Sequence, residues 1–302
     1  MSTYQSGARA ARIVCLAAFA SLLAGGVQAK ETLEKIKDNG VISLGVRDSS
    51  IPFNYNLGGV RQVGYVYDIE QKVVDEVKAQ LKLAKLEVKE IPVTSQNRIP
   101  LLQNGTIDLE CGSTTNNTER QKQVSFSTTF FIIGTRLLTA KDSGVKDFPD
   151  LKGKTVVTTA GTTSERLIRK MNDEKAMGMN IVSAKDHGQS LLMLESKRAV
   201  AFMMDDVLLY GERAKARNPG DWVVVGTAQS REAYGCMIRK DDASFKALVD
   251  GVITKLMKTG EIREMYKKWF LQPVPPKGLE LGFALSPDME ELFKNPNDKA
   301  FE

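Results

Sequence analysis

The residues best suited to bind a small anion lie between Thr94 and Gln121, where two polar loops each carry one arginine. Arg98 lies in the first loop and Arg120 in the second. A guanidinium presents a planar fork of donors that can hold a carboxylate through two hydrogen bonds. The small hydrogen-bonding residues beside the two arginines are Ser95, Asn97, Ser113, Thr114, Thr115 and Thr118. The pattern indicates a concave site for a small anion or dianion, although an arginine in a polar loop is ordinarily a solvated surface residue.

Apolar residues between and before these loops predict the elements that position them. An apolar face over 99–102 predicts a short helix, Asn104-Gly105 predicts a turn, and the alternation over 107–109 predicts a strand. Upstream, the apolar run 41–46 predicts a buried strand, which Arg47 follows directly. Ligands in open α/β sheets bind beyond the carboxyl ends of strands, so Arg47 is placed to be a third cationic contact.

Helix and strand patterns alternate along this part of the chain. Residues 67–81 carry apolar side chains at four-residue steps, as one face of a helix does, and residues 86–89 alternate as a strand. With the strand at 41–46 and the elements over 99–109, the order is strand, helix, strand, helix, strand. That order predicts a parallel sheet with right-handed crossovers.

A second unit repeats this order further along. The predicted strand 155–159 runs into Gly161-Thr162-Thr163, which opens a helix. Backbone N–H groups at a helix N-terminus suit a carboxylate, although the same residues also make an ordinary helix cap. Asp205 follows the predicted strand 199–204, where it is a candidate partner for an ammonium group or, alternatively, the cap of the next helix.

His187 is the only histidine in the protein. It lies in the segment Lys185-Asp186-His187-Gly188, where residue preferences favour a solvated turn residue. The sequence contains no second histidine and no cluster of cysteine and glutamate at ligand spacing. We therefore expect neither a metal site nor a cofactor.

The first 29 residues have the features of a secretory signal. Arg9 and Arg12 precede the apolar run 13–23, and Val27-Gln28-Ala29 offers a small-residue cleavage site. We expect cleavage there and an exported protein, because the run is too short for a convincing membrane span. Cleavage leaves 302 − 29 = 273 residues, enough for two domains, and lowers the formal net charge from +5 to +3 by removing two arginines. A charge this small gives no reason to propose nucleic acid as a partner.

Two cysteines remain after cleavage, Cys111 and Cys236. In an exported protein such a pair can form a disulfide, and the alternative is that each is a small buried apolar residue. The sequence leaves both possibilities open, because it does not give the Cα separation on which a disulfide depends.

Short motifs follow one another in a specific order between residues 32 and 272. They are Leu44-Gly45-Val46-Arg47, Gly64-Tyr65-x-x-Asp68-Ile69, Leu102-x-x-Gly105-x-x-Asp108, Thr118-Glu119-Arg120, Phe126-Ser127, Leu151-Lys152-Gly153-Lys154, Gly161-Thr162-Thr163 and Gly260-Glu261-Ile262. In order and spacing they resemble the bacterial extracellular solute-binding proteins, family 3, which are the periplasmic amino-acid-binding proteins of ABC importers. Within that family, the runs SQNRIPLLQNG, ECGSTTNN, AKDHG, AFMMDD and EAYGC resemble the glutamate/aspartate-binding subgroup.

The resemblance implies an α/β protein with the type II periplasmic binding protein fold, in which each of two lobes is a mostly parallel sheet flanked by helices. The implied divisions are a signal peptide at 1–29, the first part of lobe one at 30–134, lobe two at 139–230, the second part of lobe one at 235–272 and a C-terminal extension at 273–302. Two crossing strands near 134–138 and 230–235 would form a hinge, and ligand would shift the equilibrium toward a closed state. The proline-rich extension departs from a minimal family member, and we expect a polar tail there.

The resemblance also implies which residues bind the two ends of an amino acid. Arg120 would clamp the α-carboxylate with the help of Thr115, and the N–H groups at Thr162-Thr163 would add to it. Asp205 and Ser113 would bind the α-ammonium, where a fixed carboxylate offsets the desolvation of a buried cation.

The candidates that remain suit a carboxylate on the ligand side chain. These residues are Arg47, Ser95, Arg98 and His187. A neutral side chain would leave buried arginines unpaired, which is costly, so the extra cations favour an acidic ligand.

We therefore expect a monomeric periplasmic protein, not an enzyme, that binds L-glutamate and L-aspartate in an interlobe cleft and delivers them to the membrane permease of an ABC importer. One alternative is a binder of glutamine or another polar amino acid. A second is a dehydratase-like enzyme, in which His187 or Asp206 would act as general acid, although neither has a second catalytic partner in the sequence. A third is the sensor domain of a signalling protein, which no membrane span or kinase-like segment supports.

Overall fold

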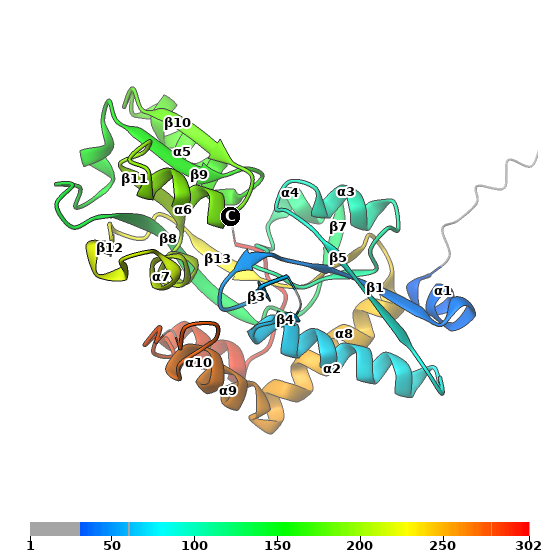
Figure 1. Ribbon diagram of the computed structural model, residues 1–302. Helices are drawn as coiled ribbons and strands as arrows, with labels where there is room; N and C mark the ends of the chain where they lie inside the picture. Colours follow the sequence, from blue (N-terminus) through cyan, green and yellow to red (C-terminus); the bar gives the residue numbers. More distant parts are fainter. Residues whose placement is uncertain (1–30, 60, 279, 302) are drawn as a thin grey trace, which may run out of the picture. The chain divides into compact units, whose positions relative to one another are not determined.

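The computed structural model describes residues 31–59, 61–278 and 280–301 (Figure 1). The predicted signal peptide lies outside these residues. Within them, no helix combines the length and the apolar character needed to cross a membrane. The backbone is built on two mixed sheets and one small antiparallel sheet, each flanked by helices.

The first sheet has the strand order β5-β1-β6-β14-β7. Its strands are β1 (Val41–Val46), β5 (Glu87–Pro92), β6 (Leu109–Glu110), β7 (Val124–Phe126) and β14 (Met237–Arg239). The strand β1 pairs in parallel with β5 and β6, whereas β14 is antiparallel to β6 and β7. A strand from late in the sequence therefore returns to the sheet that carries Arg47 at the end of β1.

The second sheet has the order β10-β9-β11-β8-β12, with β13 paired to β8 off this path. Its strands are β8 (Phe131–Ala140), β9 (Thr155–Thr159), β10 (Asn180–Ala184), β11 (Ala201–Asp205), β12 (Trp222–Val225) and β13 (Arg231–Tyr234). The parallel pairs join β9 to β10 and β11, and the long strand β8 runs antiparallel to its partners. The first half of β8 pairs with β13, so the two segments expected to cross between lobes lie side by side.

The remaining elements surround these sheets. The α-helices are α1 (Thr32–Asn39), α2 (Tyr65–Gln80), α3 (Arg98–Gln103), α4 (Thr118–Gln121), α5 (Thr163–Glu174), α6 (His187–Glu195), α7 (Asp206–Lys215), α8 (Ala243–Thr259), α9 (Glu261–Tyr266) and α10 (Pro287–Lys294). The small sheet and the tighter or wider turns of helix are β2 (Ser49–Ser50), β3 (Asn54–Leu57), β4 (Arg61–Val63), η1 (Phe148–Leu151), η2 (Pro219–Asp221) and η3 (Lys267–Leu271). Helices α2 and α8 pack on each other, and α5, α6 and α7 contact β9 and β11 or their neighbours.

Helix α2 begins two residues earlier than its apolar spacing predicts, because Gly64 allows a sharp entry. This glycine has φ +140°, and a Cβ on it would lie 2.1 Å from the carbonyl oxygen of Phe53. Only a residue without a side chain can make that approach. The predicted strand over 86–89 also shifts, and β5 runs from Glu87 to Pro92.

A cluster of buried aromatic rings packs beneath the junction of β8 and β13. Phe131 of β8 lies 5.0 Å, centroid to centroid, from Phe270 and 6.4 Å from Tyr234 of β13. Phe53 contacts both Phe131 and Tyr234 edge to face, at 4.9 and 5.3 Å. Each such pair is worth about 0.5–1.5 kcal/mol beyond the area it buries. The cluster fixes Tyr234, whose hydroxyl reaches the functional site described below.

The C-terminal extension is not the polar tail that its prolines suggested. It contains α10, whose residues Met289, Leu292 and Phe293 are buried. Arg263 of α9 donates two hydrogen bonds to the Glu290 carboxylate, at 2.7 and 2.6 Å. The i, i+3, i+4 spacing of the three apolar residues is the signal that a reading centred on the prolines missed.

Candidate ligand-binding site

Three arginines predicted as cationic contacts are buried rather than solvated. Arg47 directly follows β1, Arg98 is the first residue of α3, and Arg120 lies in α4. Their exposed fractions are 2 %, 1 % and 6 %, respectively. The ordinary expectation of a solvated surface residue is therefore wrong for Arg98 and Arg120. Burying a guanidinium is costly unless its donors and its charge find partners.

Arg98 is only partly satisfied by the protein. Its Nη1 donates to the hydroxyl of Thr114 and to the carbonyl oxygen of Ser113 at 3.2 Å, and it lies 3.5 Å from Oε1 of Glu110. Its Nε is buried and has no hydrogen-bond partner among the described residues. Arg98 is therefore not a free cation, because the buried Glu110, which was not predicted to belong to the site, offsets part of its charge.

Arg47 reaches toward the same region from the first sheet. Its Nη2 donates to Oγ of Ser95 at 3.0 Å, which connects two residues predicted to act together. Its Nη1 is buried and finds no partner in the part of the chain that the structure describes. Burial, followed by the positive charge of Arg98, lowers the pKa of Arg47 to about 10. The negative charge of a nearby anion would raise the pKa of Arg47 again.

His187 is fully buried, which contradicts the solvated turn favoured by residue preferences. It is the first residue of α6, and its Nδ1 lies 2.9 Å from Oγ1 of Thr159 at the end of β9. Its Nε2 is buried without a partner within the described ranges. Burial, with the positive charges of Arg47 and Lys215 beside it, holds the pKa of His187 well below its usual range. The imidazole is therefore neutral near pH 7 and can donate one hydrogen bond through Nε2 when Nδ1 accepts from Thr159.

Arg120 connects loops from the two large sheets. Its Nη1 donates to the carbonyl oxygen of Thr115 at 2.8 Å, and its Nη2 to that of Gly161 at 3.3 Å. Gly161 has φ +77°, and a Cβ on it would lie 2.7 Å from the Cα of Gln96, so the Gly161 loop also touches the backbone of the loop that carries Gln96. Burial, followed by the charge of Arg98, lowers the pKa of Arg120 to about 9.

The threonines beside Arg120 differ in how they are used. Thr162 caps α5, because its hydroxyl accepts from the N–H of Glu165 at 3.0 Å and donates to the carbonyl of Thr159 at 2.7 Å. The ordinary cap interpretation therefore holds for the Thr162 side chain. Oγ1 of Thr163 lies 3.5 Å from Oγ1 of Thr115, so these two hydroxyls face each other across the two loops.

Asp205 ends β11 and is 1 % exposed. Its carboxylate makes no capping bond to α7; instead it accepts from the hydroxyls of Tyr234, Thr135 and Ser164. Burial, followed by the negative charge of Glu232, raises the pKa of Asp205 to about 7. The alternative interpretation of the Asp205 side chain as a helix cap is wrong. Its buried carboxylate forms no ion pair among the described residues.

The last predicted contact, Ser113, is 8 % exposed, and its Oγ lies 3.4 Å from that of Ser50. Two residues later in the chain than Cys111, it belongs to a segment fixed by a disulfide between Cys111 and Cys236. The N–H of Cys111 also donates to the buried Glu70 at 2.9 Å. The pairing that the sequence left open is therefore present, and it holds the loop with Ser113 against the connection between β13 and β14.

Buried carboxylates are the functional features that the sequence analysis missed. Glu110 lies opposite Arg98, and Glu232 of β13 lies near Asp205. The available signal was that each carboxylate is the first residue of a motif, ECGSTTNN or EAYGC, that the sequence had already singled out. No group of three or more potential metal ligands occurs in the described residues.

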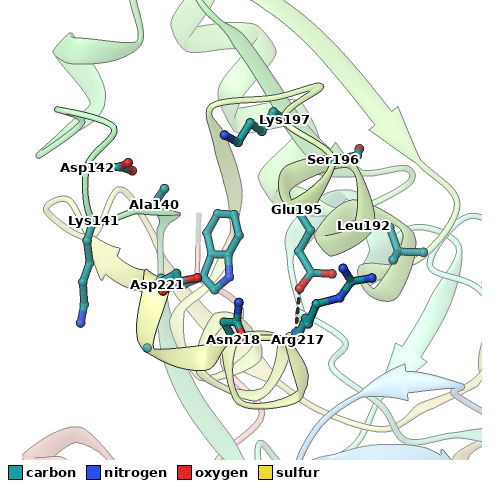
Figure 2. Close-up of a pocket in the computed structure, with 12 residues that line it drawn as sticks. Ala140, Lys141, Asp142, Leu192, Glu195, Ser196, Lys197, Arg217, Asn218 and Asp221 are labelled. Carbon is teal, nitrogen blue, oxygen red and sulfur yellow. Dashed lines mark hydrogen bonds between the residues drawn. The ribbon is translucent and has the colours of Figure 1, made fainter.

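A surface hollow of about 770 Å³ lies away from this site (Figure 2). It is lined by Leu192, Lys197 and Trp222, among others. Glu195 and Arg217 also line it, and the backbone N–H of Arg217 donates to the Glu195 carboxylate at 2.8 Å. None of the residues predicted from the sequence to bind ligand lines it. We place the candidate site at the buried, unpaired donors instead, because leaving them without a partner costs more than leaving an open hollow filled with water.

The fold and the site define a class of protein. Strand ends and the segments that follow them carry three buried arginines, a buried histidine and a buried carboxylate. This is the arrangement of an α/β protein that binds small charged molecules.

The chain belongs to the bacterial extracellular solute-binding proteins, family 3, whose model matches residues 42–272. It is 59 % identical over 295 residues to the L-glutamate/L-aspartate-binding protein of Pseudomonas aeruginosa, covering 96 % of this chain and 97 % of the relative. It is 58 % identical over 272 residues to the glutamate/aspartate import solute-binding protein of Escherichia coli, covering 90 % of each. Among solved structures, a mutant of the arginine-binding protein of T. maritima superposes with a TM-score of 0.70 at 28 % identity, covering 78 % of this chain and 98 % of the other.

These comparisons confirm the family and the type II periplasmic binding protein fold implied by the motifs. The similar proteins are solute-binding proteins of bacterial importers and not enzymes. The expectation of a binding protein rather than an enzyme is confirmed as well.

Proposed function

We propose that this protein captures L-glutamate and L-aspartate in the site formed by Arg47, Arg98, Arg120, His187 and Asp205. It then delivers them, as a periplasmic monomer, to the membrane permease of an ABC importer. The relatives in Pseudomonas aeruginosa and Escherichia coli carry the names of glutamate/aspartate-binding proteins, which supports the same ligands here.

One observation carries the choice of an acidic ligand. Nη1 of Arg47, Nε of Arg98 and Nε2 of His187 are all buried and unpaired among the described residues. All three belong to the residues assigned to a ligand side-chain carboxylate. Arg47 and Arg98 are also among the charges that lower the pKa of His187, so the three groups lie close together. A carboxylate has two oxygens and about four acceptor positions, which matches three donors better than an amide does.

The other end of the ligand would bind between Arg120 and Asp205. Arg120 keeps its charge beside the facing hydroxyls of Thr115 and Thr163, which suits an α-carboxylate. Asp205 would bind the α-ammonium, whose positive charge offsets the cost of the buried carboxylate. The site then satisfies each of the three charges of an acidic amino acid with a fixed group of opposite sign.

Glutamine would leave the cationic side of this site uncompensated. Its amide has one acceptor oxygen, and its NH₂ group would point donors at donors. A site built to bind a charged partner rejects the neutral analogue, because its own buried polar groups are left unpaired. No residue contact favours glutamine over glutamate as ligand.

Calorimetric titration tests this proposal. Mature protein stripped of retained ligand by unfolding and refolding is titrated with glutamate, aspartate, glutamine and asparagine. We expect saturable one-site binding of the two acids and roughly 5- to 150-fold weaker binding of the amides, since one unpaired buried donor costs about 1–3 kcal/mol. Preferential binding of the amides would contradict the roles of Arg47 and Arg98, and binding of none of the four would contradict the proposed ligand class.

A further inference from the structure

Two buried carboxylates are connected by a chain of hydroxyl groups. Oγ1 of Thr135 lies 3.2 Å from Oδ1 of Asp205, and the same hydroxyl lies 2.5 Å from Oγ of Ser230. Oγ of Ser230 lies 2.6 Å from Oε1 of Glu232. Three oxygen–oxygen hydrogen bonds thus join Asp205 of β11 to Glu232 of β13.

The chain contains too few hydroxyl protons for its three hydrogen bonds. Thr135 and Ser230 each supply one O–H, which satisfies two of the contacts. If both hydroxyls donate outward to ionised carboxylates, the contact of 2.5 Å between them has no proton. A proton on Asp205 completes the chain: Asp205 donates to Thr135, Thr135 to Ser230, and Ser230 to Glu232. The geometry therefore favours one proton shared by the two carboxyl groups.

Burial and the surrounding charges support this sharing. Asp205 and Glu232 are 1 % and 5 % exposed, and Oε2 of Glu232 is buried with no partner in the described part of the chain. No ion pair joins either carboxylate to a cation among those residues. Two like charges this close in a dry environment raise the affinity of one of them for a proton.

The groups that face the pair come from several elements. From α4, the Arg120 guanidinium is stabilised by the charge of Glu232. From α7, Asp206 adds a negative charge, which Arg136 of β8 partly offsets. The Tyr234 hydroxyl from β13 donates to Asp205 and favours its ionised form. The remaining neighbour of Asp205 is the Ser164 hydroxyl of α5.

We propose that Asp205 and Glu232 hold one shared proton in the ligand-free protein, and that the α-ammonium of the ligand displaces it to solvent. Glu232 is in this account a positioning residue that acts through Asp205. The inference rests on the proposed function, because it requires a ligand with an ammonium group at Asp205.

Ligand affinity then depends on pH in a predictable direction. The pKa of Asp205 is raised to about 7, so Asp205 is protonated below that pH and ionised above it. A protonated Asp205 must lose its proton before it can bind an ammonium, so affinity falls as the pH is lowered. For one released proton the fall is roughly tenfold per pH unit well below the pKa. The charges of glutamate itself do not change between pH 6 and 8.

Titration calorimetry with glutamate, in buffers of low and high ionisation enthalpy, counts the released protons. In the parent protein we expect roughly one proton released per bound glutamate at pH 6 and almost none at pH 8. Glu232→Gln removes the negative charge that, after burial, contributes most to the raised pKa of Asp205, so a larger fraction of Asp205 is ionised at pH 6. This variant should release a smaller fraction of a proton at pH 6 than the parent protein does, and its affinity should vary less between pH 6 and 8.

Two further variants keep the test decisive. Ser230→Ala breaks the hydroxyl chain and should also reduce the proton count, which provides an answer if the Glu232 variant does not fold. Glu212→Gln is the matched control, because Glu212 is equally buried and its pKa is also raised to about 7, but it faces Lys215. It should keep the parent proton count.

The outcomes separate the two proposals. Equal binding enthalpies for the parent protein in all buffers at pH 6 would overturn the shared proton while leaving glutamate binding intact. An unchanged proton count in the Glu232 variant would assign the proton to another group and would also overturn it. Absence of glutamate binding at pH 8 would instead contradict the proposed function.

Discussion

Two regions of the site are equally buried but differ in how their charges are balanced. The cationic region consists of Arg47, Arg98 and His187, and the anionic region consists of Asp205 and Glu232. In the cationic region each residue keeps a buried nitrogen unpaired among the described residues. In the anionic region hydroxyl groups surround Asp205 and connect it to Glu232. Among the described residues, the cationic region has donors without an acceptor. The anionic region is already hydrogen-bonded, but no cation forms an ion pair with it.

The difference separates selectivity from pH response. Guanidinium groups stay charged over the physiological range, and His187 stays neutral, so the cationic region presents constant donors. Burial and the negative charge of Glu232 raise the pKa of Asp205 to about 7, so Asp205 titrates within the physiological range. Ligand choice is therefore expected to depend on the cationic region and the pH dependence of affinity on the anionic region.

The largest effect is expected for Arg120, whose charge interacts with Arg98 of the cationic region and with Glu232 of the anionic region. Arg120→Met should weaken glutamate and glutamine alike, because both ligands have the α-carboxylate that we propose Arg120 binds. Removing one partner of a buried, hydrogen-bonded charge pair costs about 2–5 kcal/mol, roughly 30-fold to several thousand-fold in Kd. Titration calorimetry of both ligands measures it. Arg166→Met removes an exposed arginine whose charge also reaches Arg120, and as a control it should change either Kd less than threefold, since exposed charges interact weakly.

The next effect concerns the stability that the disulfide between Cys111 and Cys236 gives to the fold. Replacing Cys111 and Cys236 by alanine opens a loop of 125 residues and should lower the free energy of unfolding by about 2–5 kcal/mol. The ratio of glutamate to glutamine affinity should stay the same, because the disulfide contacts neither end of the ligand. Chemical denaturation of the variant, and of the parent with and without reductant, measures the stability. A changed selectivity with unchanged stability would show that the disulfide shapes the cationic region directly.

The smallest effect is expected at His187. His187→Gln should weaken glutamate binding by about 1 kcal/mol, or roughly fivefold, because one neutral hydrogen bond is lost. Glutamine binding should hardly change. The pKa of His187 is held well below its unfolded value, so the unfolded chain takes up a proton first as the pH falls below about 6.5 and the parent loses stability there. The variant should lose less stability between pH 7 and pH 5, and an identical loss in thermal unfolding would contradict the neutral, buried imidazole.

The sequence predicted the scaffold because local patterns determine it. The strand before Arg47, the helix after Gly161 and the strand that ends at Asp205 all follow from apolar spacing and turn residues. The family and its fold followed from the order of the motifs. The expected polar tail was wrong because Met289, Leu292 and Phe293 were read as part of a proline-rich end rather than as one helical face.

The burial and pairing of the site residues could not be predicted in the same way. That Arg98 meets Glu110, or that Asp205 meets Glu232, depends on how β6, β11 and β13 are placed in space. Such long-range pairs have no local signature, because each residue alone looks like an ordinary polar residue at the end of a strand. His187 shows the same limit, since its burial comes from packing of α6 against β9 and not from its own loop.

The most direct test of the account compares two ligands in two proteins. Arg47→Met keeps the apolar stem of the side chain while removing the charge and the unpaired Nη1. We predict that it weakens glutamate roughly 30-fold or more, as expected for the loss of about 2–5 kcal/mol at a buried charge pair, and weakens glutamine much less. Calorimetry on the parent and the variant with both ligands gives the coupling between the Arg47 charge and the ligand side-chain charge. Equal losses for glutamate and glutamine would contradict the claim that the cationic region selects the acidic side chain.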